Sequence, residues 1–473
     1  MKTKIVATLG PASSSPDKME ALIKAGVDVF RINFSHADPE ALPSQIKILR
    51  EIINRYHGRC AILGDLQGPK IRIGEVKGNA VKLEPNMQIR LAGGNGISDE
   101  SLLWISYNEL SKDVKPGETI LLDDGKLSLK VESRTEEGFL MARVLVGGIL
   151  THRKGVNLPE SRLTVPSLTE KDHADLKLAS QLELDWIALS FVRSAKDITE
   201  LRKEIRRLSR NWNPGIIAKI EKPEAVKNLD EIIEVADALM VARGDLGVEM
   251  PFEQVPAIQK TIIRKAVPMC KPVIVATQML EGMLTNTRPT RAEINDVANS
   301  VMDGADALML SGETSTGQYP VEAVEAMSRI IAETEKFPET YHRPQFHPGT
   351  KTSRAVSDAI IGAAVELSMQ LEAKALLTYT LTGYTARKLS SLRPYAPIFI
   401  FAKSLRLIRR LNLHWGVTGF VQKNLHYTDD NLGQMLALLL REQQVQKGDV
   451  VIKIAGFPMK EKVKSNMVVV SRV

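Results

Sequence analysis

Short apolar runs alternate with amphipathic segments along much of the chain. Eight runs are almost continuously apolar and rich in Val, Ile and Leu, a pattern typical of parallel strands covered on both faces. These predicted strands are residues 4–8, 28–35, 60–66, 186–191, 216–221, 238–243, 272–278 and 307–312. Helical periodicity appears between them at 17–24, 43–56, 170–182, 196–208, 223–235, 252–266 and 291–302. This alternation predicts a closed parallel (β/α)₈ barrel, although an open doubly wound sheet has the same periodicity and is the alternative.

The spacing is interrupted once, between the third and fourth predicted strands. Shorter strands with alternating polar and apolar residues occupy this interval, at 70–73, 80–83, 88–91, 119–122, 127–132 and 139–146. Asp123-Asp124-Gly125 is a hairpin-turn sequence between two of them. We predict that residues 70–164 form an inserted β-rich domain, and that residues 1–69 and 165–340 form the barrel. Such an insert emerges where barrel active sites form, so we expect a lid.

A further domain follows a Pro-rich linker at residues 338–349. Helical patterns recur at 353–369, 386–392, 405–413 and 432–445, and strand patterns at 375–380, 398–402, 419–422, 450–455 and 467–471. We therefore predict that residues 350–473 form a C-terminal α/β domain.

Composition narrows the class of protein. Charged residues make up 25% and the hydrophobic set 44% of 473 residues, which is ordinary for a globular protein. The two cysteines, Cys60 and Cys270, lie in apolar runs, which predicts buried thiols in a reducing cytoplasm and excludes a disulfide scaffold. No apolar stretch reaches the roughly 18 residues of a membrane helix, and the N-terminus lacks a signal-peptide core.

The chain has a formal net charge of +7. Its basic residues are spread along the sequence, and no nucleic-acid-binding motif accompanies them. We therefore exclude a nucleic-acid partner, because small phosphorylated ligands explain a mild positive excess equally well.

Polar residues stand at the C-terminal end of every predicted barrel strand, where barrel enzymes place their chemistry. In chain order they are Thr8; Arg31, Asn33 and Ser35; Asp65; Ser190; Lys219 and Glu221; Arg243 and Asp245; Thr277; and Ser311 and Glu313. One polar residue at a strand end is usually a helix cap. Eight strand ends with polar residues, all meeting at one opening of the barrel, predict an active site there.

The strongest pair is Lys219 and Glu221, two residues apart in an apolar strand, so that both side chains point the same way. A structural salt bridge would also explain them, but we favour a chemical role because buried charges are costly unless paired or bound to a ligand. Asp245 lies beside two glycines and adds a second carboxylate. Glu221 and Asp245 suit Mg²⁺ (or Mn²⁺) completed by substrate phosphate and water, unless they are ordinary capping acids.

These residues occur in motifs of a known family. The chain resembles pyruvate kinases of the bacterial type over essentially its whole length. The matching segments are 4–13, 31–36, 68–72, 154–159, 215–223, 241–247, 276–280, 289–293 and 310–314. The resemblance implies a cytoplasmic glycolytic phosphotransferase, commonly a homotetramer, that moves the phosphoryl group of phosphoenolpyruvate to ADP and yields pyruvate and ATP.

The resemblance also implies a role for each site residue. Lys219, Thr277 and Arg31 would be catalytic, and Thr277 would take part in protonating the enolate carbon through water. Phosphoenolpyruvate would be bound by Arg31, Lys219, Arg243, Gly244, Asp245 and Thr277, and Mg²⁺ by Glu221 and Asp245. The nucleotide would be held by Asn33, His36, Arg72 and Lys154. Ser311 and Glu313 match a supporting pair after the last strand.

The sequence departs from the family pattern at a monovalent-cation site. Many members bind K⁺ through Asn and Ser on the second strand and Asp and Thr on the third. Here Asn33, Ser35 and Asp65 are present, but Leu66 replaces the Thr and Lys70 stands where K⁺-requiring members have Glu. This combination resembles the K⁺-independent branch, so we expect the Lys70 ammonium to substitute for K⁺.

The C-terminal domain contains a hydroxyl-rich turn before a helix, formed by Thr380, Thr382, Gly383 and Thr385. Hydroxyls and a helix N-terminus bind phosphate well, so we expect a phosphorylated effector there, either a sugar phosphate or AMP. Lys460, Lys462 and Lys464 would add positive charge. A capped helix with a solvated basic tail is the alternative.

Two other functions remain open. Another Mg²⁺-dependent barrel enzyme that acts on phosphoenolpyruvate or a similar enolate would share the Lys219, Glu221 and Asp245 set. A non-catalytic metabolite sensor would use the C-terminal domain, but such a protein would not need both Lys219 and Asp245.

Overall fold

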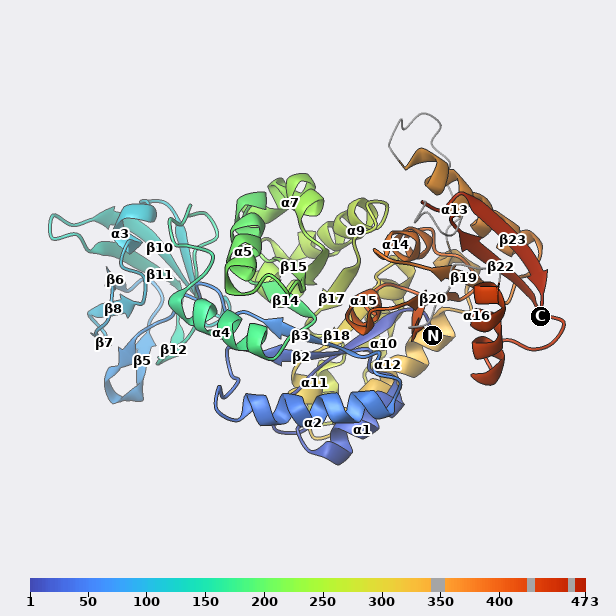
Figure 1. Ribbon diagram of the computed structural model, residues 1–473. Helices are drawn as coiled ribbons and strands as arrows, with labels where there is room; N and C mark the ends of the chain where they lie inside the picture. Colours follow the sequence, from blue (N-terminus) through green and yellow to red (C-terminus); the bar gives the residue numbers. More distant parts are fainter. Residues whose placement is uncertain (342–353, 423–429, 458–463) are drawn as a thin grey trace.

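Eight parallel strands close into a barrel at the centre of the computed structural model, which describes residues 1–341, 354–422, 430–457 and 464–473 (Figure 1). The strands are β1 (Lys4–Thr8), β2 (Val29–Asn33), β3 (Ala61–Asp65), β14 (Trp186–Leu189), β15 (Gly215–Ile220), β16 (Ala238–Ala242), β17 (Val273–Ala276) and β18 (Ala307–Leu310). Around the barrel they follow the order β1-β18-β17-β16-β15-β14-β3-β2, and β2 pairs with β1. The predicted barrel is confirmed and the open doubly wound sheet is wrong.

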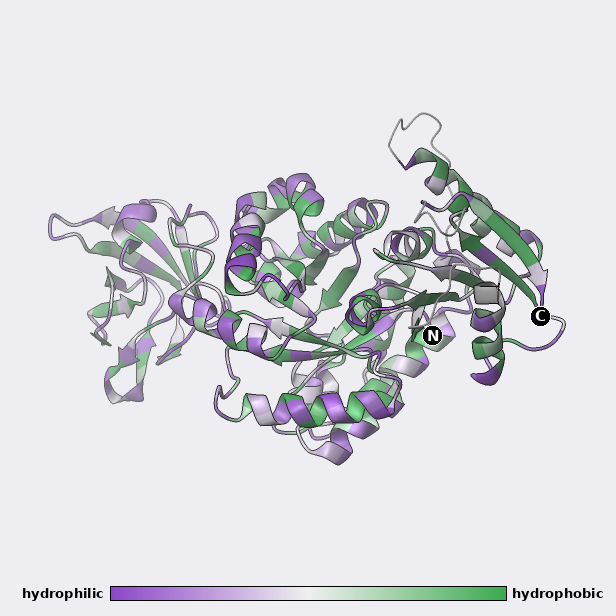
Figure 2. Ribbon diagram, in the orientation of Figure 1, coloured by the Kyte–Doolittle hydropathy of each residue, from purple (hydrophilic) through white to green (hydrophobic). Residues whose placement is uncertain are grey.

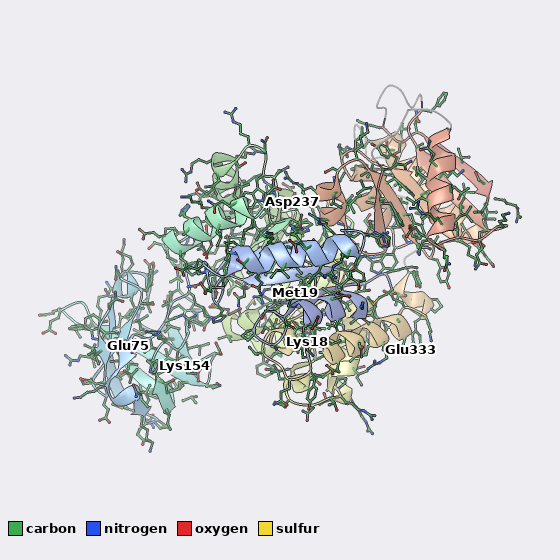
Figure 3. All side chains as sticks on the ribbon, turned by 60° about the horizontal axis from the view of Figure 1, so that its bottom comes forward. Lys18, Met19, Glu75, Lys154, Asp237 and Glu333 are labelled. Atoms are coloured by element: carbon green, nitrogen blue, oxygen red, sulfur yellow. The ribbon has the colours of Figure 1, made fainter. Side chains whose placement is uncertain are left out.

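Helices cover the outside of the barrel and present their apolar faces to it (Figure 2). They are α1 (Pro16–Ala25), α2 (Leu42–Arg55), α4 (Glu170–Gln181), α5 (Ala195–Leu208), α6 (Pro223–Lys227), α7 (Leu229–Val235), α8 (Arg243–Glu249), α9 (Val255–Ala266), α10 (Arg291–Met302), α11 (Gly312–Ser315) and α12 (Pro320–Thr334). On α1, for example, Met19 is buried against the barrel while its neighbour Lys18 is exposed (Figure 3).

The barrel helices differ from the sequence prediction in four places. The helix predicted at 223–235 is interrupted at Asn228, whose backbone leaves the helical conformation and whose side-chain Nδ2 donates to the carbonyl oxygen of Arg193. Helices α8, α11 and α12 were not predicted. The sequence hides α8 because its two glycines are poor helix formers.

The inserted domain lies at one end of the molecule (Figure 1) and has its own apolar core. Its main sheet has the order β13-β9-β10-β11-β6-β8, formed by β6 (Gln88–Gly93), β8 (Leu102–Ile105), β9 (Thr119–Leu122), β10 (Leu127–Arg134), β11 (Leu140–Val146) and β13 (Val156–Asn157). Smaller elements are β4 (Glu75–Val76), β5 (Ala80–Leu83), β7 (Ile97–Ser98), α3 (Leu110–Asp113) and β12 (Gly148–Thr151). The predicted strand at 70–73 is wrong, since only isolated bridges form at Arg72 and Ile73.

The C-terminal domain lies at the opposite end of the barrel (Figure 1). Its sheet has the order β21-β20-β19-β22-β23, formed by β19 (Ala375–Tyr379), β20 (Ile398–Ala402), β21 (Val417–Val421), β22 (Val450–Ala455) and the antiparallel β23 (Met467–Arg472). The helices are α13 (Ala355–Gln370), α14 (Tyr384–Ser391), α15 (Leu405–Leu411) and α16 (Asp430–Arg441). The predicted α/β class is confirmed, while linker residues 342–349 lie outside the described part of the chain.

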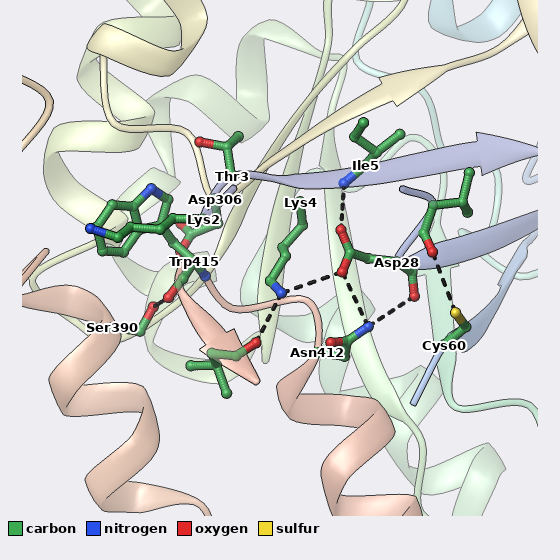
Figure 4. Close-up of polar contacts among 12 residues, drawn as sticks. Lys2, Thr3, Lys4, Ile5, Asp28, Cys60, Asp306, Ser390, Asn412 and Trp415 are labelled. Atoms are coloured by element: carbon green, nitrogen blue, oxygen red, sulfur yellow. Dashed lines mark hydrogen bonds and ion pairs between the residues drawn. The ribbon is translucent and has the colours of Figure 1, made fainter. Parts of the chain in front are cut away.

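The C-terminal domain closes the bottom of the barrel, away from the strand ends that hold the polar residues. Leu413, just after α15, packs with the apolar side chains of the barrel interior. Beside it, Asn412 donates to the carbonyl oxygen of Asp28, and Lys4 pairs with the Asp28 carboxylate at 3.3 Å (Figure 4). Cys60 is buried as predicted, whereas Cys270 is only half-buried and that prediction is wrong.

We expect Gly215→Ala, at the start of β15, to lower the free energy of unfolding by about 1–3 kcal/mol. An added Cβ would lie 2.2 Å from the Trp186 ring, where the core is already full. The matched control is Gly433→Ala at an exposed position of α16, where an added Cβ meets no atom within 4 Å and should stabilise by about 1 kcal/mol. Urea denaturation of both variants measures these changes, and equal stabilities would contradict the packing account.

Candidate active site

A cavity of about 130 Å³ opens at the C-terminal ends of the barrel strands. Its lining combines residues at the C-terminal ends of β2, β3, β14 and β15 and one residue of α8 with residues of the connection to the inserted domain. They are Arg31, Asn33, Ser35, His36, Asp65, Leu66, Gln67, Lys70, Arg72, Ser190, Phe191, Lys219, Glu221 and Asp245. Positions far apart in the sequence therefore meet here, because parallel strands end at one face of a barrel.

Lys219 has three polar neighbours in the cavity. Its Nζ donates to Ser190 Oγ at 2.7 Å and lies 2.9 Å from Glu221 Oε1 and 3.4 Å from Asp65 Oδ1. Burial alone would lower the pKa of Lys219, but the charges of Asp65, Glu221 and Asp245 outweigh it and raise that pKa. Lys219 is therefore a permanent buried ammonium at neutral pH.

Arg31 supplies a second cation to the same cavity. Asp65 Oδ2 accepts from Arg31 Nε at 2.8 Å and lies 2.7 Å from Nη2, while Arg31 Nη1 donates to Thr8 Oγ1 at 3.0 Å. Burial would raise the pKa of Asp65, yet Lys219 and Arg31 together hold it below its usual range. The ionised Asp65 thus fixes two cations that face the same space, an arrangement suited to a phosphoryl group.

Glu221 is fully buried, and its two oxygens have different surroundings. Oε2 accepts from the backbone N–H of Phe191 at 2.7 Å, whereas Oε1 forms only the ion pair with Lys219, without a hydrogen bond. Burial and the nearby charge of Asp245 raise the pKa of Glu221, although Lys219 opposes the shift. A bound cation would lower the cost of keeping this carboxylate ionised.

Among the described residues, no three His, Cys, Asp or Glu side chains converge as a complete metal cage. Glu221 and Asp245 nevertheless line one cavity, and Glu221 Oε1 is buried without a hydrogen-bond donor. Two carboxylates in an open cavity fit Mg²⁺, which usually keeps waters and takes further oxygens from a substrate phosphate.

The guanidinium of Arg243 points away from this cavity. Its Nη1 donates to Asp296 at 2.8 Å and its Nη2 to the carbonyl oxygen of Thr277 at 2.8 Å. The backbone N–H of Gly244 donates to Thr277 Oγ1 at 2.8 Å, so these two predicted neighbours do meet. Thr277 has a φ of 72°, a left-handed conformation that is strained for a β-branched residue and typical of functional sites.

The strained turn at Thr277 is supported from the last barrel strand. The buried Glu313 carboxylate accepts from the backbone N–H of Leu280 at 3.0 Å and from that of Ser311 at 2.7 Å. Glu313 therefore ties the end of β18 to the turn after β17.

The structure places three of the four residues predicted to bind the nucleotide in the cavity and one outside it. Asn33, His36 and Arg72 line the cavity, and His36 is exposed. Lys154 does not line it and instead pairs with Asp123 of the inserted domain at 2.9 Å.

The predicted vestigial cation site has few free ligands. Asn33 Oδ1 accepts from the backbone N–H of Ser35 at 3.1 Å, and both Asp65 oxygens face Arg31 or Lys219. Leu66 is buried and offers no side-chain oxygen. Lys70 is exposed and lines the cavity.

The predicted effector turn is largely engaged with its own domain. Thr380 Oγ1 accepts from the backbone N–H of Gly383 at 2.8 Å, and Gly383 has the φ of 84° that glycine allows. Thr385 Oγ1 lies 2.9 Å from Ser465 Oγ, whereas Thr382 is exposed. Lys464 is exposed, and Lys460 and Lys462 lie outside the described residues.

Sequence reasoning missed several residues that shape the site. Phe191, with a φ of 53°, orients Glu221 through its backbone N–H. Lys222 and Glu249 form a buried pair beside the two predicted metal ligands. Their positions in the sequence could have indicated this pair, since Lys222 directly follows Glu221 and Glu249 lies one helical turn beyond Asp245.

Comparison with known proteins agrees with this geometry. Residues 1–324 match the family model described as "Pyruvate kinase, barrel domain", and residues 358–471 match "Pyruvate kinase, alpha/beta domain". The chain is 43% identical to pyruvate kinase of Methylorubrum extorquens, over 99% of this chain and 96% of the relative. It is also 43% identical to that of Geobacillus stearothermophilus, over 98% of this chain and 79% of the relative.

A solved structure shows the same fold. The crystal structure of a pyruvate kinase from Cryptosporidium parvum superposes with a TM-score of 0.91 at 35% identity, covering 100% of this chain and 96% of that one. Together with the two domain matches, this similarity shows that the chain belongs to the pyruvate kinase family.

Proposed function

We propose that this protein transfers the phosphoryl group of phosphoenolpyruvate to ADP and releases pyruvate and ATP. The observation that supports this most is the buried Lys219 ammonium, held by Asp65 and Glu221 in a cavity that also receives Arg31. Phosphoryl transfer chiefly requires positioning and neutralisation of spreading negative charge, which these cations supply.

In this mechanism the β-phosphate oxygen of ADP attacks the phosphorus of phosphoenolpyruvate while its bond to the enol oxygen breaks. Arg31 would bind the transferring phosphoryl group, and Lys219 would stabilise both that group and the enolate oxygen left behind. Glu221 and Asp245 would hold Mg²⁺ (or Mn²⁺), which when bound neutralises phosphate and enolate charge. The backbone at Gly244 and Asp245 would bind the substrate carboxylate.

The enolate carbon must then gain a proton to give pyruvate. Thr277 is the proposed participant, acting through water, and its contact with Gly244 supports a position close to the substrate carboxylate. Asn33, His36 and Arg72 would hold the nucleotide, joined by Lys154 if the inserted domain closes over the cavity.

A different Mg²⁺-dependent barrel enzyme acting on phosphoenolpyruvate or a similar enolate is the alternative. Purified protein supplied with phosphoenolpyruvate, Mg²⁺ and ADP separates the two functions. Formation of ATP that requires all three supports the proposal, and consumption of phosphoenolpyruvate without ADP supports the alternative.

We also propose that activity does not require K⁺. With Lys70 lining the cavity, an added cation would face a like charge, at a cost on the order of 1–4 kcal/mol between water-like and intermediate dielectric. Leu66 removes a hydroxyl ligand, and the Asp65 oxygens are engaged by Arg31 and Lys219.

Activity should therefore be nearly equal in KCl and in a buffer whose only monovalent cation is organic, at the same ionic strength. Lys70→Glu should lower activity without K⁺ and regain part of it when K⁺ is added. Lys77→Glu, in the inserted domain, is a matched charge control. A large gain of the wild-type rate on addition of KCl would show that Lys70 does not replace the ion.

The C-terminal turn is the proposed site of activation by a sugar phosphate or AMP. Its exposed Thr382 and the N–H groups at the start of α14 are the available donors, because Thr380 and Thr385 already have partners. Thr382→Ala should shift the activation midpoint of the effector severalfold without changing the basal rate. If the activation curves of Thr382→Ala equal those of the wild type for every phosphorylated compound tested, the effector site does not lie at this turn.

We further propose a cytoplasmic homotetramer, as the family resemblance implies. In the part of the chain that the structure describes, no helix is sufficiently long and apolar to span a membrane. Light scattering coupled to size-exclusion chromatography measures the assembly, and a monomer mass would contradict the tetramer.

A further inference from the structure

A buried carboxylate links the inserted domain to the two predicted metal ligands. Glu249 is the last residue of α8, one helical turn beyond Asp245, and its side chain is 1% exposed. Its Oε1 accepts from Lys222 Nζ at 2.6 Å and from Asn157 Nδ2 at 2.8 Å. Both donors therefore converge on one oxygen of a buried acid.

The two donors come from different parts of the molecule. Asn157 belongs to β13, which pairs with β9 in the main sheet of the inserted domain. Next to it, the backbone N–H of Val156 donates to Ile71 at 3.0 Å, which ties together the two chain segments that connect the inserted domain to the barrel. Movement of this domain must therefore move the Asn157 amide relative to Glu249.

Lys222 lies on the barrel side of the contact. It directly follows Glu221, and its Nζ lies 5.9 Å from the centre of the Phe191 ring. The backbone N–H of Phe191 is the group that orients Glu221 Oε2, at 2.7 Å. Lys222 therefore lies beside the residue whose backbone N–H orients Glu221.

The second oxygen of Glu249 has no partner. Oε2 is buried and accepts no hydrogen bond, although an unpaired buried carboxylate oxygen is costly. Glu249, Lys222, Asn157, Asp245 and Lys70 all line a narrow cavity of about 30 Å³ between the inserted domain and the barrel.

We propose that Glu249 is a positioning residue that couples the placement of the inserted domain to the orientation of Asp245 and Glu221. One route runs along α8 from Glu249 to Asp245, and the other runs through Lys222 to Phe191 and Glu221. The inference rests on the proposed function, in which these two acids bind the metal and the inserted domain closes over the nucleotide.

The test measures Mn²⁺ binding to the substrate-free enzyme by calorimetry, alongside kcat and the KM for ADP. Asn157→Ala should weaken Mn²⁺ binding about three- to tenfold, the effect of losing one hydrogen bond that orients a ligand. Glu249→Gln should do the same, and both should raise the KM for ADP. The matched control is Gln88→Ala, which removes an amide–carboxylate hydrogen bond of 2.8 Å to Glu132 wholly within the inserted domain.

The double variant separates coupling from general damage. If Asn157 acts through Glu249, the double variant should bind Mn²⁺ as weakly as Glu249→Gln alone, because neighbours in one network are not additive. Additive losses, or wild-type Mn²⁺ affinity in Asn157→Ala, would overturn the proposal. If Glu249→Gln does not fold, the Mn²⁺ affinity of Asn157→Ala alone tests the proposal, because Asn157 is only half-buried and its loss is tolerated more easily.

The outcomes also separate this inference from the proposed function. An enzyme without phosphoenolpyruvate- and ADP-dependent ATP formation but with the predicted Mn²⁺ changes would contradict only the function. An active enzyme whose Mn²⁺ affinity is the same in wild type and both variants would contradict only the positioning role.

Discussion

Lys219→Met should reduce phosphoryl transfer on the order of 10³-fold or more while the barrel stays folded. Lys219 is a buried ammonium beside Glu221 and Asp65, and in the proposed mechanism it stabilises charge that appears only in the transition state. Methionine fills a similar volume without that charge. Steady-state kinetics should therefore show the loss in kcat more than in the KM for phosphoenolpyruvate.

The matched control is Lys265→Met, which removes an exposed lysine that pairs with Asp230 at 2.7 Å, far from the cavity. Its kinetics should equal those of the wild type. Near-normal turnover of Lys219→Met, with Lys265→Met also normal, would contradict the role assigned to Lys219.

The stability of Lys219→Met should depend on pH in a defined direction. Without the ammonium, the pKa values of Asp65 and Glu221 rise because two buried acids lose their shared partner. Each folded-state pKa then lies above its wild-type value, so the folded variant binds more protons than the folded wild type, and the stability lost by the substitution grows as pH rises through these pKa values. Relative to wild type, the variant should therefore be less destabilised at pH 5 than at pH 8 in urea unfolding.

Asp245→Asn should raise the Mg²⁺ concentration for half-maximal activity at least about tenfold. Removing a group that only orients a metal ligand already lowers metal affinity by about that factor, and Asp245 is a proposed ligand itself. A neutral amide is a poorer ligand for a hard cation than a carboxylate, and Glu221 alone would remain. The maximal rate should also fall, because the surviving ligand holds the ion less firmly.

The measurement is a titration of activity with MgCl₂ at saturating phosphoenolpyruvate and ADP. Asp230→Asn, at an exposed position on α7, serves as the control and should leave the midpoint unchanged. A midpoint for Asp245→Asn equal to that of the wild type would remove Asp245 from the metal site.

Periodicity predicted a parallel sheet covered on both faces, because each strand is almost continuously apolar. An open doubly wound sheet shares that pattern, and it was the number of eight strands alternating with helices that favoured the closed barrel. Periodicity also placed Lys219 and Glu221 together, since their spacing of two is the repeat of a strand. The cavity that unites them with Arg31 and Asp65 follows from the fold, in which β2, β3 and β15 end at one face.

The directions of individual side chains near the site could not be predicted from the sequence. Arg243 turns toward Asp296 and the Thr277 carbonyl, a choice made by tertiary contacts that no local pattern encodes. The pairing of Lys154 with Asp123 depends on how the inserted domain folds. Helix α8 was missed because buried neighbours outweigh the poor helix propensity of its glycines, although Asp245 and Glu249 have helical spacing.

The central claim is that the cavity around Lys219, Glu221 and Asp245 moves a phosphoryl group from an enol oxygen to ADP. Phosphorus NMR of purified protein with phosphoenolpyruvate, ADP and Mg²⁺ follows that transfer directly, because the phosphorus signals of substrate and ATP are distinct. The account predicts that the phosphoenolpyruvate signal disappears as the γ-phosphate signal of ATP grows in equal amount, and that Lys219→Met abolishes both changes. Release of inorganic phosphate without ATP, or an unchanged rate in Lys219→Met, would contradict it.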